Sequence, residues 1–470
     1  MDRGKKVHTL IKSLTVKELH DRSDVNVDFL NAISIFMGPN GIGKSTILGI
    51  LVQFLSCQWA RLAKQPFVSA TIEFPSGQTI SVTKAECQDF VSSDMSSRTQ
   101  QIVSTLAEAG LLDAFLDGKI LTQEEISSVG LGKLIQERDL RILRSTLLQY
   151  GQSVRSLSSL SATARTVKAC FSGHIIYLPT YRRIEQDITE LLSLSPMMMR
   201  RVQSEIQETL NSANPGTVEI VRFGMEDIES LLADYTQTIK EYSRQQINSL
   251  ATAYLNAALK NRQHFEKDFF NSLSDNRIKD VLSRVDDREL DTSQRKGITD
   301  LIKSLRKREG YGRLTKNQEH IAGYFPMLAE THDRISGREE PLNKLAKILN
   351  GYLGPDKRAE YDPVKYVFTV KVGDTKIPLS GLSSGEKQLM SLFATLALND
   401  SRKLLVVIDE PELSLSVLWQ ENLLSDIMSI ENCANVIAVT HSPFIYGEKL
   451  SSFTRDLSDF SHPSATALLQ

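Results

Sequence analysis

The sequence predicts an α/β fold in which a mixed sheet with flanking helices carries a phosphate-binding loop and is interrupted by a large, mainly helical insertion. Three observations predict this fold. An apolar, β-branched run at 32–37 leads directly into the glycine-rich stretch Gly38–Ser45, and a helical pattern follows. A second continuous apolar run, 404–408, ends in two acidic residues. Between them, most of residues 88–360 have helical periodicity.

Residues 38–45 read Gly-Pro-Asn-Gly-Ile-Gly-Lys-Ser and fit the pattern G-x-x-x-x-G-K-[ST] between a predicted strand and a predicted helix. The glycines allow successive N–H groups to point at phosphate oxygens, and the helix N-terminus adds partial positive charge. We expect Lys44 to reach the β- and γ-phosphates and Ser45 to ligate magnesium. The candidate nucleotide-binding residues are Gly38, Pro39, Asn40, Gly41, Ile42, Gly43, Lys44, Ser45 and Thr46.

The apolar run 404–408 is typical of a parallel strand that is buried on both faces. Asp409 and Glu410 follow it, at the edge where open α/β sheets bind ligands. Asp409 is a candidate magnesium ligand, and Glu410 is a candidate base for the attacking water. His441 ends another predicted strand, 435–440, and could contact the γ-phosphate or that water. The alternative interpretation is that Asp409 and Glu410 are solvated acidic residues at the end of a strand and that His441 is an ordinary surface histidine.

A further motif begins the predicted apolar helix 389–397. It consists of Ser383, Ser384, Gly385 and Glu386 and follows a probable hairpin at 367–379. Hydroxyl and free N–H groups at a helix N-terminus form an anion site that need not serve the phosphate loop of the same chain. An ordinary helix cap is the alternative interpretation.

These four motifs, in this order, resemble the ATP-binding-cassette (ABC) class of ATPases. Ser384 and Glu386 depart from the glycine and glutamine usual in the signature of that class. The long insertion between Lys44 and Asp409 resembles the structural-maintenance-of-chromosomes (SMC), RecF and OLD-like branch. Residues 409–415, Asp-Glu-Pro-Glu-Leu-Ser-Leu, are similar to a run in OLD-like ATPases, where a histidine commonly follows; here it is Ser416.

The resemblance implies an ABC-type ATPase head that binds ATP and Mg²⁺ and hydrolyses the ATP. It also implies two heads packed head-to-tail around two ATP molecules. Lys44, Glu410 and His441 would be catalytic, and Ser45 and Asp409 would hold the metal. The other chain would contribute its signature residues in trans, namely Ser383, Ser384, Gly385 and Glu386.

The predicted strand 174–179 leads into Arg182 and Arg183, in the place of the Q-loop of such a head, where the usual glutamine is missing. These arginines could contact a phosphate or a neighbouring subunit, or could form ion pairs that hold a loop. In the helical arm, the spacing of residues 228–242 predicts a short heptad-like seam. Lys303, Arg306, Lys307 and Arg308 are the best local candidates for DNA contact, although a solvated helix face is the more common origin of such a run.

Composition and net charge argue against several classes of function. The 470 residues are 41% hydrophobic and 24% charged with a net charge of −2, which excludes a global electrostatic attraction to nucleic acid or an acidic membrane. The basic N-terminus is not followed by an apolar core, and no apolar run approaches the roughly 20 residues of a membrane span. The four cysteines show no zinc spacing. We expect a cytoplasmic protein without a membrane partner.

We expect five segments. They are an N-terminal ATPase lobe (1–87), a helical insertion (88–170), a strand and Q-loop-like segment of the head (171–194), a helical arm or dimerisation insertion (195–360) and a C-terminal ATPase lobe with the signature (361–470). Only residues 442–470 follow His441, so we expect neither the TOPRIM nuclease domain of OLD nucleases nor any other nuclease site in this chain.

The segment 177–185, together with the head motifs, resembles the PtuA family, the ATPases of Septu and related retron anti-phage systems. That resemblance implies a larger assembly of ATPase dimers, a separate HNH nuclease subunit of the PtuB type, and phage or invading DNA as an indirect target. Two alternatives stay open: a RecF- or SMC-like DNA-repair ATPase, and the ATPase of a PARIS-type system with a TOPRIM partner. Whether hydrolysis is fast, slow or suppressed in the complex also stays open.

Overall fold

The computed structural model describes residues 9–39, 41–91, scattered positions between 102 and 147, and then 151–179, 217–219, 225–259, 267–284, 290–307, 314–399, 403–413 and 415–464. The chain divides into two compact units, residues 1–221 with 400–470 and residues 222–399. The expected mixed α/β fold is confirmed. No helix among these described residues is long and apolar enough to cross a bilayer.

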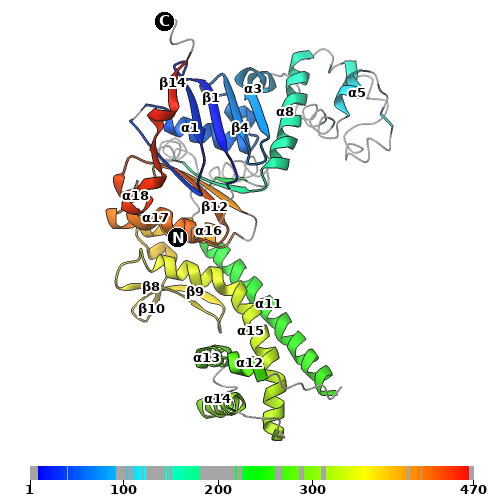
Figure 1. The fold of residues 1–470 in the computed structure, drawn as a ribbon, viewed down its shortest axis with the longest axis vertical. Coiled ribbons are helices and arrows are strands. Elements are labelled where there is room, and N and C mark those ends of the chain that lie inside the picture. The colour runs from blue at the N-terminus through cyan, green and yellow to red at the C-terminus, as the bar shows by residue number, and fades with distance from the viewer. Residues whose placement is uncertain are drawn as a thin grey trace, which may run out of the picture. The chain divides into compact units, whose positions relative to one another are not determined.

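The first unit is built around a six-stranded, all-parallel sheet with the order β13-β3-β12-β11-β6-β7 (Figure 1). Every residue of β11 is buried, as the continuous apolar run predicted. The four inner strands are those expected from the sequence, while the short edge strands β7 and β13 were not predicted. The strands are β3 (Ile33–Met37), β6 (His174–Leu178), β7 (Thr217–Glu219), β11 (Leu404–Asp409), β12 (Cys433–Val439) and β13 (Thr454–Asp456).

A five-stranded antiparallel sheet with the order β14-β2-β1-β4-β5 lies in the same unit. Its strands β4 and β5 form an antiparallel hairpin. Side chains of α1 (Lys44–Leu55) belong to one hydrophobic core with residues of both sheets. The strands are β1 (Ser13–Leu19), β2 (Ser23–Asp28), β4 (Ser69–Glu73), β5 (Thr79–Thr83) and β14 (Ser461–Pro463).

Helices and short helical turns make up the rest of the described part of the first unit. They are α2 (Trp59–Leu62), α3 (Lys84–Val91), α5 (Leu112–Leu116), α8 (Gly151–Cys170), α17 (Val417–Ser429), α18 (Pro443–Leu450), η4 (Ser451–Phe453) and η5 (Leu457–Phe460). Of these, α17 and α18 follow β11 and β12 and begin at the edge of the sheet where the candidate site lies.

The second unit contains two long helices that run side by side, α11 (Met225–Leu259) and α15 (Lys316–Leu349) (Figure 1). Ile228, Leu232 and Ile239 are buried along α11, as the heptad-like spacing predicted. Further along the pair, the rings of Tyr254 and Tyr324 meet edge to face with centroids 5.0 Å apart.

A small antiparallel sheet and the signature helix belong to this second unit. The strands β8 (Lys357–Asp362), β9 (Val367–Val372) and β10 (Thr375–Ile377) include the expected hairpin. They are followed by η3 (Leu379–Gly381) and α16 (Ser384–Ala397). Contacts therefore group residues 361–399 with the helical arm, whereas the sequence analysis assigned 361–470 to one lobe.

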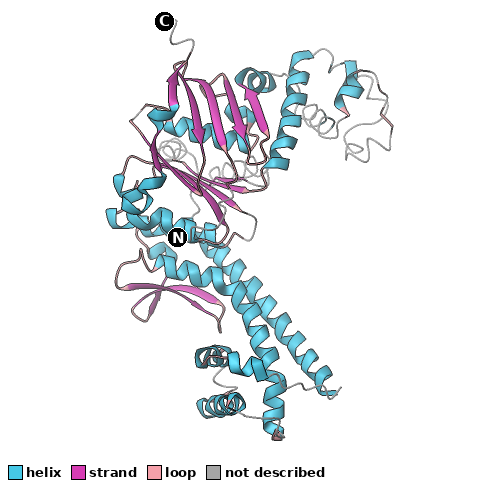
Figure 2. Cartoon of the chain, in the orientation of Figure 1, coloured by secondary structure: helices cyan, strands magenta, loops and turns pink. Residues whose placement is uncertain are grey.

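Among the described residues between α11 and α15 lie three shorter helices, α12 (Lys267–Ser272), α13 (Asp275–Ser283) and α14 (Thr292–Arg306) (Figure 2). Their apolar faces pack against the first half of α15 in a core of their own, which includes Phe270, Ile302 and Phe325. The described residues of segment 195–360 are mainly helical, and they also include β7 and most of β8.

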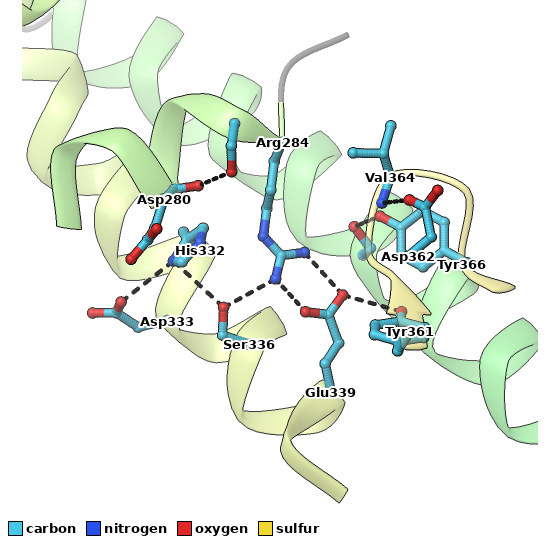
Figure 3. Close-up of polar contacts among 12 residues, drawn as sticks. Asp280, Arg284, His332, Asp333, Ser336, Glu339, Tyr361, Asp362, Val364 and Tyr366 are labelled. Carbon is cyan, nitrogen blue, oxygen red and sulfur yellow. Dashed lines mark hydrogen bonds and ion pairs between the residues drawn. The ribbon is translucent and has the colours of Figure 1, made fainter. Parts of the chain in front are cut away.

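A buried polar network ties this arm to the small sheet, as Figure 3 shows. Arg284, at the end of α13, donates to both carboxylate oxygens of Glu339 on α15 and, at 3.0 Å, to Ser336 Oγ. The hydroxyl of Tyr361 on β8 donates to Glu339 Oε1 at 3.2 Å. Burial raises the pKa of Tyr361, and the adjacent Glu339 acts in the same direction. The Glu339 carboxylate is 2% exposed, and the cost of its burial is offset by bonds from Arg284 on one side and Tyr361 on the other.

Candidate active site

Three adjacent parallel strands bring the predicted catalytic motifs to one edge of the sheet. The pairing register sets Phe36 of β3 opposite Val439 of β12, and Val439 opposite Asp409 of β11. The phosphate loop follows β3, His441 follows β12, and Glu410 follows β11. Since parallel strands end at the same edge, residues far apart in the sequence lie together where open α/β sheets bind ligands.

The phosphate loop has the backbone that its glycines predict. Gly41 and Gly43 have φ values of +87° and +92°, a region that other residues rarely adopt. Gly43 also precedes the first turn of α1 and packs closely on β1, since a Cβ added there would lie 2.8 Å from Leu19 Cδ2. Asn40, another candidate loop residue, lies outside the described residues.

Lys44 is 6% exposed, and its ammonium group is held by the loop itself. Nζ donates to the carbonyl oxygens of Gly38 at 2.9 Å and Pro39 at 3.0 Å. Burial lowers the pKa of Lys44, and four nearby carboxylates act in the opposite direction, those of Glu410, Asp409, Glu412 and Asp456. A desolvated cation that donates to two neutral carbonyls of this loop is suited to exchanging them for phosphate oxygens.

Glu410 has a strained backbone. Its φ is +51°, in the left-handed region, and its N–H donates to the carbonyl of Val439 on the neighbouring strand at 2.8 Å. Its Oε1 lies 3.9 Å from Nε2 of His441. Non-glycine residues persist in this region where their surroundings fix them, commonly at functional sites. Asp409, before it, is 4% exposed.

Glu412 joins the ends of β11 and β12, a role to which the sequence analysis assigned no residue. Its Oε2 accepts a hydrogen bond from Thr440 Oγ1 at 2.7 Å. Its Oε1 accepts from the backbone N–H groups of His441 at 2.7 Å and Ser442 at 3.1 Å. The acidic run 409–412 contained the signal, but the partners of Glu412 depend on strand pairing that one motif does not reveal.

A cavity of about 390 Å³ opens beside the phosphate loop. The end of β1 and the tight turn from β1 into β2 form one wall, and Glu18 in the strand and His20 and Asp21 in the turn all have positive φ values. His20 Nε2 lies 3.4 Å from Thr46 Oγ1 in α1. No residue of this turn was predicted from the sequence to belong to the site. The lining consists of Leu19, His20, Arg22, Ser23, Gly41 and Ile42.

Asp456 is a second acidic residue that the sequence analysis did not single out. It ends the edge strand β13 beside β3, and its Oδ1 lies 3.6 Å from where a Cβ on Gly38 would be. Its side chain accepts from the backbone N–H of Ser458 at 2.8 Å and from the Ser458 hydroxyl at 2.5 Å, which lowers the pKa of Asp456. This carboxylate is therefore ionised close to the beginning of the phosphate loop.

The signature residues begin α16 in the second unit. Ser383 and Glu386 form a reciprocal capping box, and Lys357 Nζ donates to both Glu386 oxygens at 3.0 and 2.7 Å. Burial raises the pKa of Glu386, but the bonds from Lys357 and Ser383 outweigh it, so the pKa lies below its usual range. Ser383 and Ser384 are exposed, whereas Gly385 and Glu386 are buried. The two serines are therefore the signature side chains that a second molecule could reach.

The basic candidates are engaged within the arm. Lys303 and Arg306 on α14 approach the Asp275 carboxylate at 3.1 and 2.9 Å, and Arg306 also donates to the carbonyl of Leu273. Lys307 is exposed. Three other candidates lie outside the described residues, namely Arg182, Arg183 and Arg308.

The donor set fits a magnesium ion that is shared with a nucleotide. Among the described residues, no group of three or more His, Cys, Asp or Glu side chains is arranged to hold a metal. Magnesium commonly takes only one or two protein ligands and completes its shell with phosphate oxygens and water. Ser45, at the start of α1, and the buried Asp409 are the residues that would supply those protein ligands.

Comparison with known proteins gave one family match and a group of similar structures. The family described as "AAA domain, putative AbiEii toxin, Type IV TA system" matches residues 232–446. A Smc head domain with an extended coiled coil, bound to the C-terminal domain of ScpA and derived from Pyrococcus furiosus, is 14% identical. The similarity covers 93% of this chain and 90% of that chain with a TM-score of 0.31. A SmcHead bound to the C-winged helix domain of ScpA is 11% identical, over 93% and 91%, with a TM-score of 0.32.

A search of curated proteins gave no match. The matched range begins in α11 and ends in α18, so it includes the signature residues, Asp409, Glu410 and His441 but not the phosphate loop. Residues 232–446 are therefore similar to this AAA-domain family, and the phosphate loop lies N-terminal to them at the sheet edge that Asp409 and His441 share.

Proposed function

We propose that this chain binds and hydrolyses ATP with Mg²⁺ at the edge of the parallel sheet. The observation that carries the proposal is the arrangement of Lys44, Glu410 and His441 at the ends of three adjacent strands. Lys44 would bind the β- and γ-phosphates, with Gly38–Thr46 around them. The cavity between the β1–β2 turn and the loop would accept the nucleoside.

Glu410 would orient the attacking water and take its proton. His441, 3.9 Å away, would contact the γ-phosphate or the same water. Ser45 and Asp409 would hold the magnesium ion, which neutralises phosphate charge when bound. Electrostatic stabilisation and orientation account for most of the catalysis in this reaction class, so fixed donors at a partly buried site suit it.

Two variants test the activity. Lys44→Ala should abolish measurable ATP binding, because it removes the buried cation, and Lys64→Ala, at an exposed lysine of the same unit, is the matched control. Glu410→Gln should bind ATP within about threefold of wild type but lower turnover by about 10²–10⁴-fold, because an amide keeps the shape but is not a base. The exposed Glu431 gives the control Glu431→Gln. Turnover unchanged in Glu410→Gln would reassign the base.

We propose that the working unit is a head-to-tail dimer, in which Ser383, Ser384 and the N-terminus of α16 from one chain cover the nucleotide of another. The exposed position of the two serines at a helix N-terminus supports this. Gly385 and Glu386 would act indirectly by holding that helix end. The dimer would belong to a larger assembly, with the helical arm as a second contact surface.

The biological role that we propose is an anti-phage defence complex in the cytoplasm, in which this ATPase scaffolds and gates a separate nuclease. The resemblance to PtuA suggests an HNH partner of the PtuB type, with phage or invading DNA as the indirect target. The description of the matched family as a putative toxin of a Type IV toxin–antitoxin system supports membership in a conflict system.

The first test of this role is to isolate the chain from its native cells and identify its partners by mass spectrometry. A co-purified HNH protein would support the proposal, and a TOPRIM protein would move the assignment to a PARIS-type system. Recovery without any nuclease would favour the RecF- or SMC-like repair role. That role predicts salt-sensitive DNA binding by this chain alone, weakened by changing Arg306, Lys307 and Arg308.

A further inference from the structure

The strand-end segment Thr440–Ser442, which carries His441, is held mainly by one carboxylate. Glu412 accepts hydrogen bonds from the hydroxyl of Thr440 and from the backbone N–H groups of His441 and Ser442, at 2.7, 2.7 and 3.1 Å. Charge-assisted bonds of this kind are roughly twice as strong as neutral ones. A single side chain on the loop after β11 thus fixes three consecutive residues after β12.

The ring of His441 needs such a tether because its own side chain is 36% exposed. The position of Nε2 relative to Glu410 Oε1 is therefore set largely through the backbone of residue 441. Glu410 is fixed in the same way, because its N–H donates to the carbonyl of Val439. The two candidate catalytic side chains are held by bonds that cross between the same two strand ends.

A second contact restrains the same segment from α17. Gln420 is 7% exposed and accepts a hydrogen bond from Ser442 Oγ at 2.6 Å, while its amide donates to the carbonyl of Leu415 at 2.9 Å. This contact restrains Ser442, whereas the backbone N–H of His441 is bound by Glu412. Removal of Glu412 would therefore free the histidine without releasing the whole segment.

We propose that Glu412 is a positioning residue that holds His441 beside Glu410 through its bond to the His441 backbone. The proposal rests on the ATPase function proposed above. Glu412 takes no proton and binds no substrate in this scheme. Its removal should therefore affect the chemical step and leave ATP binding nearly intact.

Two substitutions of Glu412 distinguish the effect of its hydrogen bonds from the effect of its negative charge. Glu412→Ala removes both acceptor oxygens and with them all three hydrogen bonds. Glu412→Gln keeps Oε1, which accepts both backbone N–H groups, and presents an amide donor to Thr440 Oγ1, which can turn its hydrogen away and accept. Glu421→Ala, at an exposed glutamate of α17, is the matched control. ATP affinity, kcat, KM and the unfolding midpoint are measured for each variant.

Glu412→Ala should lower kcat by about 10²-fold, the effect of an ångström-scale misplacement of a catalytic group, with ATP affinity within threefold of wild type. Glu412→Gln should recover kcat to within about threefold, because its geometry is retained. Equal losses in both variants would overturn the proposal, as would an unchanged kcat in Glu412→Ala. If Glu412→Ala does not fold, Glu412→Asp replaces it, since its shorter side chain withdraws the carboxylate, and at least a tenfold loss of kcat is expected.

A double-mutant cycle with His441→Ala distinguishes positioning from a general structural effect. If Glu412 acts through His441, Glu412→Ala should cause no further loss of kcat in the His441→Ala background. Additive losses would overturn the proposal. Absence of turnover in the wild-type chain would instead contradict the ATPase function itself, so the two failures are distinguishable.

Discussion

At the residue scale, Gly43 shows why the phosphate loop needs glycine for two separate reasons. Its φ of +92° lies where a side chain costs roughly 1–2 kcal/mol. A Cβ at this position would also meet Leu19 of β1 at 2.8 Å. Gly77, in the β4–β5 turn, has a similar φ of +83° but nothing within 4 Å of the added atom. The two glycines therefore separate conformational strain from close packing.

Gly43→Ala should weaken ATP binding by at least tenfold, because Leu19 or the loop must shift and the N–H groups that precede α1 lose their alignment. Gly77→Ala should destabilise the fold by about 1 kcal/mol and leave ATP affinity unchanged. Isothermal titration of ATP and urea unfolding of both variants provide the comparison. Equal affinities for the two variants would show that contact with Leu19 does not shape the loop.

At the element scale, the sequence predicted the strands that consist of continuous apolar runs, because such runs indicate burial on both faces. These strands are β3, β6, β11 and β12. Three of them, β3, β11 and β12, precede a recognisable motif, so the central sheet and its ligand-binding edge could be anticipated. The edge strands β7 and β13 have three residues each and too few apolar positions to signal a strand. Their pairing with β6 and β3 comes from tertiary contacts, which override local preference.

The contents of the site were predictable to a similar extent. Lys44, Glu410 and His441 stand in motifs and could be named, but Asp456 and His20 reach the loop through elements without a motif. Glu412 stood in a recognised run, but its partners follow only from the register of β11 and β12. Similarly, Lys303 and Arg306 form a basic helix face in sequence, whereas Asp275 on another helix faces both of them.

The N-terminus of α16 should be sensitive to acid because of Glu386. Since its pKa in the folded chain lies below its usual value, its ionised form stabilises the fold at neutral pH. That contribution is lost as the pH falls below about 4.3, the ordinary pKa of a glutamate, and through the folded-state pKa. Glu386→Gln should therefore have a lower free energy of unfolding at pH 7, and the difference from wild type should shrink toward pH 3.

Urea unfolding between pH 3 and 7 measures this difference, with Lys357→Met as a second variant. Because Lys357 donates to both Glu386 oxygens, the two substitutions should be less than additive. A pH-independent gap between wild type and Glu386→Gln would contradict the assignment. The exposed Glu319 supplies Glu319→Gln as the control.

The join between the arm and the small sheet should depend on Glu339. Glu339→Ala leaves Arg284, 17% exposed, without its carboxylate, and loss of one partner of a buried pair costs about 3–5 kcal/mol. Its neighbour Glu340 is exposed, so Glu340→Ala should change stability by less than about 0.5 kcal/mol. The stabilities of the two variants are compared by denaturant unfolding, monitored by far-UV circular dichroism. Equal stabilities would mean that the network adds nothing to the fold.

At the scale of the whole molecule, the parts of the proposed ATP site are divided between two compact units. The phosphate loop, Asp409, Glu410 and His441 belong to the first unit, and the signature residues belong to the second. In a head-to-tail dimer, a complete site combines the first unit of one chain with the second unit of another. A chain with a defect in its first unit can then be complemented by a chain whose only defect is in its second unit.

The test is to combine Lys44→Ala and Ser384→Glu chains, each inactive alone, in dimers isolated by two different affinity tags. Ser384→Glu places a negative charge where the γ-phosphate would bind, yet glutamate is well tolerated in the first turn of a helix, so α16 should still form. One site of the mixed dimer joins both substitutions, and the other joins an intact Lys44 with an intact Ser384. Independent sites should therefore restore about half of wild-type turnover, as two-fold symmetry requires.

Ser249→Glu, on the exposed face of α11, should keep full activity and controls for the added charge. Mixed dimers that stay inactive would contradict a composite site in trans. Full activity of Ser384→Glu alone would mean that the N-terminus of α16 does not face the nucleotide. Recovery in the mixed dimer alone would instead establish that ATP turnover requires two chains, so that dissociation of the assembly itself can switch the ATPase off.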